Sequence, residues 1–487
     1  MTAPVNTNTV DVLIVGAGLS GIGAARHLQR ECPERTFALL ESRQSLGGTW
    51  DLFRYPGIRS DSDMYTLGYS FKPWLVSKSL ADGPAILNYL RETATETGVD
   101  KYIRYGHKVV SASWSSESAT WTVLVQCGDS GETQEFTCNF VMMCCGYYDY
   151  EKGYTPDFDG RDDFSGQVIH AQHWPQELDY KDKNVVVIGS GATAVTLVPE
   201  LAQETASTVM LQRSPTYIAS VPEQDSWAEF LRGKIPGSWV YRITRWKRVA
   251  LQIFVFNLSR WRPKVVRNLL LGQVRKELGE DYDVAKHFTP SYNPWDQRLC
   301  AVPEGDLFAA VREKRAEVVT DHVDRFTDKG ILLKSGRELA ADIIVLATGL
   351  NMKFIGGSTL TVDGHEIDPS TLHVYRGMML ANVPNLVQLF GYTNASWTLK
   401  SDLTSEYVCR LLNHMRKTGK KMAVPREPVE GIEEDKMVDL SSGYVLRSAG
   451  EFPKQGRVLP WRVYQNYILD FINLRLGSLQ DKALEIK

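Results

Sequence analysis

The sequence predicts an α/β protein built from two Rossmann-like dinucleotide-binding domains and a helical insert. Two glycine-rich loops, beginning at Gly16 and Gly189, support this fold class. Each loop follows a short apolar run typical of a strand buried on both faces and precedes a stretch that favours a helix. A third observation is a basic, aromatic stretch from 231 to 276, which predicts the helical insert.

The first loop has the spacing and the surroundings of a dinucleotide-binding turn. It follows the apolar run 12–15, and its glycines are Gly16, Gly18 and Gly21. They serve the tight turn, the close approach of backbone to a pyrophosphate and the packing of helix on strand. The next apolar run ends at Glu41, about 20 residues further on, where a carboxylate accepts hydrogen bonds from ribose hydroxyls. We therefore expect a first nucleotide without a 2′-phosphate, which fits FAD.

The second loop repeats this design with one change. The apolar run 185–188 precedes Gly189 and Gly191, and alanine replaces the third glycine, where the motif needs only helix packing. The following strand leads to Arg213 rather than to an acid. An arginine there pairs with a 2′-phosphate that a carboxylate would repel, which favours NADPH. The residues expected at this cofactor are Gly189, Gly191, Ala192, Thr193, Arg213 and Ser214.

Two later strands are expected to end beside the cofactors. The run 140–145 enters Gly146, and the run 342–347 enters Thr348 and Gly349. Both resemble the A-T-G-type junctions of flavoproteins with two dinucleotide domains. The residues expected near a cofactor at the second junction are Ala347, Thr348 and Gly349.

Composition places the chain among ordinary globular proteins and limits its partners. Its 487 residues suggest about three domains, and 43% hydrophobic residues allow substantial cores. A net charge of −3 gives no reason to expect nucleic acid. The seven cysteines show no C-x-x-C pair and no metal-ligand spacing, so we expect reduced thiols, no metal and a cytoplasmic location. Neither a signal peptide nor a membrane-spanning segment is expected.

The stretch 231–276 is strongly cationic and rich in tryptophan, and it contains no aspartate or glutamate. A helical segment of this kind can lie on the surface of an anionic membrane, as a peripheral association. It can equally be a helical subdomain whose basic face is solvated by water. The sequence leaves both interpretations open. In either case it predicts a helical insert at 221–294, within the second domain.

Between the two loops lies a pattern of five spaced residues, F-x-G-x3-H-x3-W-P. Its members are Phe164, Gly166, His170, Trp174 and Pro175. The pattern resembles the fingerprint of type I Baeyer–Villiger monooxygenases, which are class B flavoprotein monooxygenases. These enzymes use FAD, NADPH and O2 to convert ketones to esters or lactones through a C4a-peroxyflavin. The resemblance places the fingerprint in a linker that couples cofactor binding to domain movement.

Further segments extend the resemblance over nearly the whole chain. The segments 47–50 and 54–61 are similar to the flavin-contacting part of these enzymes. The segments 292–298 and 391–397 are similar to those of one subgroup, which includes the mycobacterial monooxygenase that activates the thioamide prodrug ethionamide. This likeness implies sulfides or thioamides as further substrates. The residues implied at the flavin are Gly48, Thr49, Trp50, Tyr55 and Asp61.

The resemblance also implies a catalytic pair. Arg298 matches the family's active-site arginine, and Asp61 matches the carboxylate that positions it through a charge-assisted pair. A fixed cation beside the flavin would stabilise the peroxide and the oxyanion that develops as it attacks a carbonyl. The chain departs from the family at Gln297, where many members carry a lysine that helps to hold the 2′-phosphate. Preference for NADPH would then rest mainly on Arg213, with help from the Ser214 hydroxyl.

Three other functions remain as alternatives. Heteroatom-oxidising flavin monooxygenases share both loops but usually differ at Trp174 and lack the final proline. A disulfide or electron-transfer reductase would need a redox pair, whereas Cys144 and Cys145 are adjacent on an expected buried strand. A non-catalytic nucleotide-binding or membrane-scaffold protein would consume no O2 with NADPH. A metal at His170 and His173 is not expected, because no cysteine or acidic cluster accompanies their spacing.

The order of these features divides the chain into six parts. The expected parts are 1–147 for the FAD-binding domain, 148–180 for the linker with the fingerprint, 181–220 for the NADPH-binding domain, 221–294 for the helical insert, 295–350 for the second part of the NADPH-binding domain and 351–487 for the segment that returns to the FAD domain. This last segment should bring Trp397 towards the flavin or substrate pocket.

Overall fold

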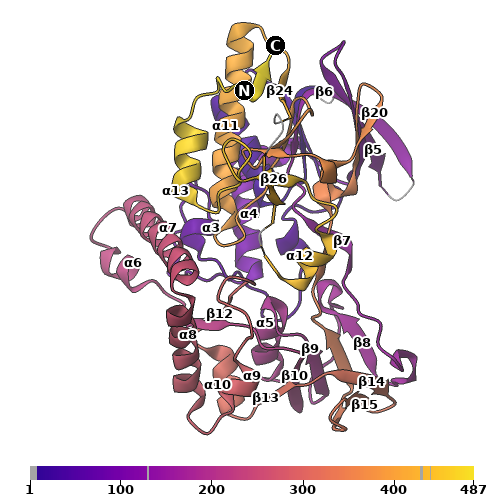
Figure 1. Ribbon diagram of the computed structural model, residues 1–487, viewed down its shortest axis with the longest axis vertical. Helices are drawn as coiled ribbons and strands as arrows, with labels where there is room; N and C mark the ends of the chain where they lie inside the picture. Colours follow the sequence, from indigo (N-terminus) through magenta and orange to yellow (C-terminus); the bar gives the residue numbers. More distant parts are fainter. Residues whose placement is uncertain (1–7, 129–130, 428–431, 439) are drawn as a thin grey trace.

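The computed structural model describes residues 8–128, 131–427, 432–438 and 440–487. The chain forms two α/β units stacked along the long axis of the molecule, and helices project from one side (Figure 1). The N-terminal strand and the C-terminal segment both lie in the upper unit. The predicted fold class, two Rossmann-like domains with a helical insert, is confirmed.

The upper unit is built on a nine-stranded sheet. The first glycine loop follows β1 (Thr9–Val15), which lies between β2 (Phe37–Leu40) and β6 (Glu132–Met143) and runs parallel to both. Residues 12–15 are buried, because the sheet is covered on both faces. The remaining strands of this sheet are β3 (Ile103–Arg104), β4 (His107–Ser115), β5 (Thr120–Cys127), β19 (Thr359–Val362), β20 (His365–Ile367) and β23 (Leu386–Gln388).

Helices from both ends of the chain cover one face of this sheet. They are α1 (Leu19–Glu31), α4 (Gly83–Thr97) and α11 (Trp397–Thr418). Their apolar side chains form one core with the β1 residues that point to this face. The amide of Asn413 in α11 donates to the last carbonyl of α1 at 2.7 Å. The returning C-terminal segment therefore completes the core of the first domain.

The lower unit contains a five-stranded parallel sheet in the order β13-β10-β9-β17-β8. The second glycine loop joins β9 (Asn184–Ile188) to α5 (Ala192–Leu201). The outer strand β8 (Gln167–His170) comes from the fingerprint. The structure differs from the expected linker 148–180 in one respect, since part of this segment is an edge strand of the second domain. In that strand the half-buried Val168 and Ile169 pair with β17 (Ile343–Leu346). The other strands are β10 (Ser207–Gln212) and β13 (Ala316–Thr320).

Two short strands carry the chain between the units. β7 (Tyr148–Gly153) leads out of the upper unit and β18 (Leu350–Met352) leads back. They pair antiparallel, with Leu350 opposite Gly153 and Met352 opposite Tyr148. Because the two crossings are hydrogen-bonded to each other, they form a single ribbon between the two domains.

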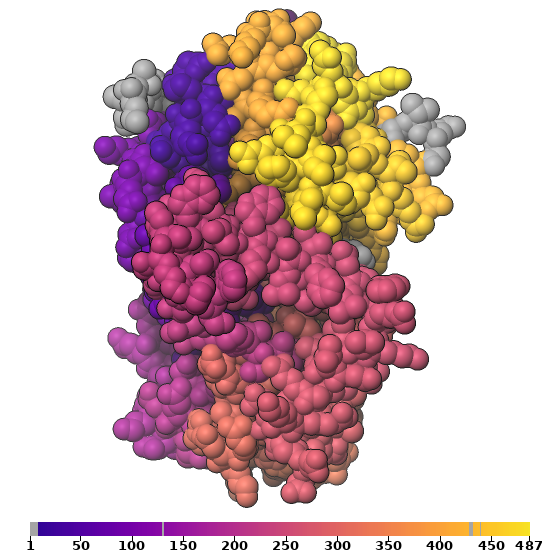
Figure 2. Space-filling model, turned by 90° about the vertical axis from the view of Figure 1, so that its left-hand side faces the viewer, coloured from indigo at the N-terminus to yellow at the C-terminus, as the bar shows by residue number. Residues whose placement is uncertain are grey.

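The helical insert lies between β11 (Ile218–Val221) and β12 (Cys300–Pro303). Its helices are α6 (Ser226–Leu231), α7 (Gly237–Trp261), α8 (Pro263–Leu278) and α9 (Val284–His287). Figure 2 shows the insert across the middle of one face of the molecule, directly beneath the C-terminal segment.

The remaining elements are short and lie mostly in the C-terminal half. They are α2 (Thr49–Leu52), α3 (Met64–Leu67), α10 (Asp306–Arg312), β14 (Val323–Thr327), β15 (Gly330–Leu333), β16 (Glu338–Ala340), β21 (Val374–Tyr375), β22 (Met379–Leu380), β24 (Ala423–Pro425), β25 (Glu434–Lys436), α12 (Gly443–Ser448), β26 (Lys454–Gly456), α13 (Tyr467–Asp470), a π-helical turn (Phe471–Leu476) and β27 (Leu484–Ile486).

A buried polar network fixes α7 to the upper unit. The Arg245 guanidinium donates to backbone carbonyl oxygens in and just after α3 at 2.8 and 2.7 Å, and it lies 3.7 Å from Asp402 of α11. Asp402 also lies 3.4 Å from His27 of α1. Burial lowers the pKa of His27, but hydrogen bonds with Asp402 and Glu31 outweigh it and raise the pKa to about 9. The imidazolium form is therefore the one that joins the three helices.

This network predicts a pH-dependent stability. The pKa of His27 rises from 6.5 to about 9 on folding. The contribution of protonated His27 to the free energy of unfolding is therefore fully present below pH 6.5 and is lost as the pH rises through about 9. His27→Gln should lower the free energy of unfolding at neutral pH by on the order of 1–3 kcal/mol and by much less at alkaline pH. Urea unfolding across a pH series measures this. The exposed His365→Gln is the control, and a His27→Gln effect independent of pH would contradict the prediction.

Candidate active site

A cavity of about 1130 Å³ lies where the two units meet. Both glycine loops line it, together with the ends of β2 and β10 and with Trp397 from the returning segment. Every residue expected at a cofactor lines this cavity except Gly21. That glycine lies behind the loop, where an added Cβ would sit 1.9 Å from the Gly16 carbonyl oxygen. Its role is close packing, as the motif predicts.

The first loop forms a narrow backbone cradle. Gly16 has φ +103°, and an added Cβ would lie 2.8 Å from the Cys144 carbonyl oxygen. Gly48, with φ +57°, lies so close to the glycine loop that a Cβ added there would be 3.2 Å from the Cα of Gly18. Side chains are thus excluded beside the N-terminus of α1, where free N–H groups favour an anion. The cradle fits the pyrophosphate of a dinucleotide.

Glu41 occupies the ribose position at the end of β2. Its side chain is buried, and it accepts hydrogen bonds from the backbone N–H of Ala17 at 2.8 Å and of Arg43 at 2.9 Å. Burial raises the pKa of this carboxyl, despite these two hydrogen bonds. Sequence reasoning missed Arg43 and Asp51, which form an ion pair at 2.7 Å beneath the Gly48 carbonyl. Arg43 follows Glu41 closely in the chain, but no pattern in the sequence marks it.

The second loop is more open. Gly189 has φ +148°, and a Cβ there would lie 2.3 Å from the Ala347 carbonyl oxygen, whereas Gly191 has no neighbour within 4 Å of such an atom. Arg213 lines the cavity at the end of β10 and forms no ion pair with any described residue. The exposed His322 lines the same part of the cavity and was not predicted. A free guanidinium beside an open glycine turn suits a phosphorylated ribose.

Arg298 and Asp61 meet across the domain boundary although they are 237 positions apart in the chain. The guanidinium Nε donates to Oδ2 at 2.9 Å, and Nη2 donates to Oδ1 at 2.8 Å. The Asp61 charge, which outweighs burial, raises the pKa of Arg298 well above its ordinary value. The arginine side chain remains 36% exposed and lines the cavity, so it presents a permanent, oriented cation there.

A second ion pair supports this contact. Arg59, two positions before Asp61, lies 2.6 Å from Asp306 at the start of α10 in the lower unit. Gly57 rests against α5, where an added Cβ would be 3.0 Å from a backbone carbonyl. The segment 53–63 of the first domain is therefore docked on the second domain at several points.

Aromatic rings surround the cation. Tyr147 packs on Trp397 with ring centroids 5.2 Å apart, and the Trp397 indole donates to the Ser20 hydroxyl at 2.8 Å. Tyr444 of α12 also lines the cavity, and burial raises its pKa. Sequence reasoning missed Tyr444 because its segment shows no motif. These side chains line the cavity that Arg298 faces.

The fingerprint residues do not line the cavity. His170 packs so tightly on the domain-crossing ribbon that a Cβ at Gly153 would lie 2.0 Å from its ring. Its Nδ1 accepts a hydrogen bond from the Gln172 backbone N–H at 3.1 Å. Trp174 contacts Tyr180 with ring centroids 6.1 Å apart. The motif thus holds the ribbon against the second domain. Among the described residues, no cluster of His, Cys, Asp and Glu could hold a metal ion.

This fold and cavity define a class of protein, a flavoprotein with two dinucleotide-binding domains that meet at an arginine. Comparisons with known proteins agree. Residues 14–74 match the family of NAD(P)-binding Rossmann-like domains, and residues 78–229 match the flavin-binding monooxygenase-like family.

Curated relatives match nearly the whole chain. The FAD-containing monooxygenase EthA of Mycobacterium tuberculosis is 53% identical over 479 residues, which cover 98% of both chains. EthA of Mycolicibacterium smegmatis is 50% identical and covers 98% of this chain and 97% of the relative. The chain belongs to the family of EthA-type FAD-containing monooxygenases. It is an FAD-containing monooxygenase, as predicted.

Solved structures show the same fold. An oxidised steroid monooxygenase bound to NADP has a TM-score of 0.78 and 22% identity, covering 98% of this chain and 99% of its own. An ε-caprolactone-bound cyclohexanone monooxygenase has a TM-score of 0.75 and 20% identity, covering 98% and 100%. At this identity the likeness concerns the fold, which is that of the two-domain Baeyer–Villiger monooxygenases.

Proposed function

We propose that this enzyme inserts one oxygen atom of O2 beside the carbonyl of a ketone, which yields an ester or a lactone. NADPH supplies the two electrons that reduce the other oxygen atom to water. We propose sulfides and thioamides as further substrates, oxidised at sulfur. The observation that carries the proposal is the Arg298–Asp61 pair, which faces the cavity between both nucleotide loops.

The residues around the cavity fit the cofactors. Gly16, Gly18 and Gly48 would hold the FAD pyrophosphate, and Glu41 would hold its ribose. When bound and reduced by NADPH, FAD supplies the activation of O2. Arg298 would stabilise negative charge that develops on the carbonyl oxygen, because its Nη1 makes no hydrogen bond to a described residue and remains available to donate.

Asp61 acts as a positioning residue in this proposal. Its bidentate contact removes the rotational freedom of the guanidinium, so that no reorganisation is needed when charge develops. The raised pKa keeps Arg298 protonated throughout the reaction. The aromatic walls of Tyr147 and Trp397 restrict water and strengthen the electrostatic contact.

The alternative function is that of a heteroatom-oxidising flavin monooxygenase. Both functions use the same cofactors and the same cavity. A fixed guanidinium beside the reacting atoms favours the carbonyl reaction, because oxygen transfer to sulfur develops no carbonyl oxyanion. Product analysis with a ketone and with a sulfide distinguishes them.

We propose that Arg213 selects NADPH. It is the cation at the ribose position of the second domain, and Gln297 cannot replace the lysine that many family members use. The Ser190 hydroxyl donates to the Ser214 carbonyl at 3.0 Å, which orders the turn beside it. The Ser214 hydroxyl remains a candidate second donor to the 2′-phosphate.

We also propose that the insert 231–276 rests on an anionic membrane surface. A stripe of apolar side chains on α7 faces solvent, and its members are Trp239, Ile243, Trp246, Phe254 and Trp261. Residues at these spacings share one helix face, which on a solvated helix is ordinarily polar. Phe254 is 63% exposed and Trp261 is 74% exposed. No helix in the described ranges is long and apolar enough to cross a membrane.

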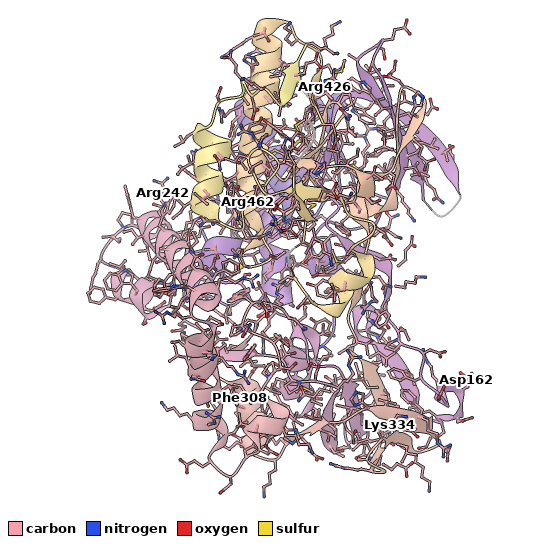
Figure 3. All side chains as sticks on the ribbon, viewed as in Figure 1. Asp162, Arg242, Phe308, Lys334, Arg426 and Arg462 are labelled. Carbon is pink, nitrogen blue, oxygen red and sulfur yellow. The ribbon has the colours of Figure 1, made fainter. Side chains whose placement is uncertain are left out.

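Cations flank this stripe. Arg242 lies over Trp239 at 5.6 Å, and Arg262 lies over Trp261 at 4.7 Å. Figure 3 shows Arg242 at the outer edge of the helix. Neither arginine forms an ion pair with a residue in the described part of the chain. Aromatic rings with adjacent cations suit the interface of a bilayer with anionic headgroups.

Not every cation of the insert is available for this contact. Arg245 is buried beside Asp402, and Lys247 and Arg248 both pair with Asp225 at 2.6 Å. The surface is therefore less basic than the sequence suggests. Apolar side chains should contribute a larger share of the binding free energy than charge does.

Replacing Arg213 by Ala should weaken NADPH binding while leaving NADH binding nearly unchanged. Loss of a charge-assisted contact with phosphate costs about 1.5–3 kcal/mol. Dissociation constants for both coenzymes measure the effect. Arg325→Ala, which removes an exposed charge outside the cavity, is the control. An equal loss for both coenzymes would exclude this role for Arg213.

Arg298→Ala should retain FAD, because the pyrophosphate cradle is untouched, and yet form little ester. Removal of one such donor typically lowers the rate about a hundredfold to a thousandfold. Residual NADPH oxidation should yield hydrogen peroxide instead of ester. Asp61→Asn should give an intermediate loss, since the arginine remains but loses its fixed orientation. Ester formation by Arg298→Ala at the parent rate would refute both the assignment and the proposed reaction.

At low ionic strength the enzyme should co-sediment with vesicles that contain phosphatidylglycerol and not with pure phosphatidylcholine. Each cation near such a surface contributes about 1 kcal/mol, and salt screens it. The combined variant Trp239→Ser, Phe254→Ser, Trp261→Ser should remain in the supernatant. Val458→Ser, at another exposed apolar position, should sediment normally. If the enzyme does not sediment with anionic vesicles at low ionic strength, the insert is a helical subdomain whose basic face is solvated by water.

A further inference from the structure

A small apolar cluster, here termed the seam, lies between α7 and the returning segment that contains α11 and α13. Its members are Val249, Ile253, Tyr392, Ala395, Leu399 and Tyr467. The two α7 residues belong to the insert, whereas the other four belong to the segment that completes the first domain. Tyr467 also packs against the main core of the first domain, so the seam lies at the edge of that core.

The seam encloses a cavity of about 10 Å³, which is space for roughly one water molecule. This small cavity and the large cofactor cavity share Ala395 as a wall. Tyr392, another member of the seam, also lines the large cavity. The two spaces are therefore neighbours at Ala395.

The outer end of the seam opens among exposed apolar side chains. Trp246 packs on Tyr467 and Phe471 with ring centroids 5.7 and 5.9 Å apart, which forms the outer rim. Phe254 and Ile472 beside this rim are exposed. The apolar surface of α7 and the π-helical turn therefore continues inward, through the seam, to the wall of the cofactor cavity.

The inner wall of the seam is rigid. The Tyr392 hydroxyl donates to Asp470 Oδ2 at 2.7 Å, and Lys400 Nζ lies 2.8 Å from the same oxygen. Both charged side chains are almost completely buried, so their pair is costly to separate. Tyr392 is thereby held in place, and any opening must come from the α7 side.

The α7 side is held only loosely at this level. Gln252 donates to Asp63 Oδ2 and Thr66 Oγ1 at 3.3 and 3.4 Å, which are long contacts. The amide oxygens of Gln252 and Asn394 are buried and accept no hydrogen bond from a described residue. Burial of an unsatisfied oxygen is unfavourable. Opening the seam would separate its apolar side chains, which costs free energy. It would also hydrate both amide oxygens, and this hydration offsets part of that cost.

From this geometry we propose that the seam is the entrance through which substrates with long unbranched alkyl chains reach the cofactor cavity. Such chains match the seam, because its six members offer apolar surface from the exposed rim to Ala395. The inference rests on the proposed oxygenation of ketones and adds to it a substrate class and a route. Short ketones do not need this route, since exposed residues such as His322 also border the large cavity.

The test is Ile253→Trp, which fills the seam without altering a residue of the cofactor cavity. Overfilling a packed site costs enough to slow passage roughly tenfold to a hundredfold. The kcat/KM for a long-chain methyl ketone such as undecanone should fall by this factor, whereas kcat/KM for butanone should stay at the parent value. Ile253→Ala, which widens the seam, should raise kcat/KM for undecanone and leave butanone unchanged.

The matched control is Leu251→Trp, which adds a ring of the same kind at a nearby exposed position of α7, outside the seam. This control should leave kcat/KM for both ketones unchanged.

A second readout is independent of turnover. Ile253→Cys should react with a long-chain alkyl methanethiosulfonate, and undecanone, but not butanone, should slow this labelling. The parent protein sets the baseline, because Cys145 and Cys300 line the large cavity.

The possible results separate the two proposals. Equal effects of Ile253→Trp on undecanone and butanone, or labelling of Ile253→Cys that undecanone does not slow, would overturn the entrance while oxygenation stands. If the parent enzyme converts neither ketone, the proposed function fails instead. If the enzyme oxidises only sulfides and undecanone still slows the labelling of Ile253→Cys, the result supports the seam as the entrance.

Discussion

One ion pair links the proposed catalytic cation, Arg298, to the assembly of the two domains. Arg298 comes from the chain that follows the insert, and Asp61 comes from the first domain. Neither domain alone contains both groups, so the oriented guanidinium exists only when the domains are docked. Arg59–Asp306 and the contact of Gly57 with α5 hold the same surface together. A rotation about the domain-crossing ribbon would move Arg298 relative to Asp61 and so couple domain position to reactivity.

The two nucleotide sites obey a different constraint, that of backbone approach. At Gly16 and Gly189 the chain takes conformations that other residues rarely adopt, and an added Cβ would strike a carbonyl of the strand beside it. These positions are set by local geometry within each βα unit. The sites can therefore form as each domain folds, whereas the Arg298–Asp61 pair depends on docking. In the proposed reaction, binding and chemistry are thus controlled by separate parts of the structure.

This division explains what the sequence could predict. The loops, Glu41 and Arg213 follow from local motifs, because strand, turn and ribose position occur within one βα unit. Arg298 and Asp61 are 237 positions apart, and only family resemblance joined them. The expected linker is partly strand β8, because pairing with β17 depends on a strand far along the chain. Tyr444 and the seam could not be predicted, since they arise where separate segments meet.

The helix α7 carries the surface on which the proposed membrane contact rests. Among its inward residues, Arg245 anchors the insert to the upper unit. Val249 and Ile253 form one side of the seam. In its outward stripe, Phe254 and Trp261 are largely exposed, so these two side chains contribute little to folding through burial. Exposed aromatic surface favours aggregation unless it is covered. A bilayer would cover it and would also hold apolar substrates next to the rim of the seam. The same helix would then place the enzyme at the source of its substrate and border the path to the flavin.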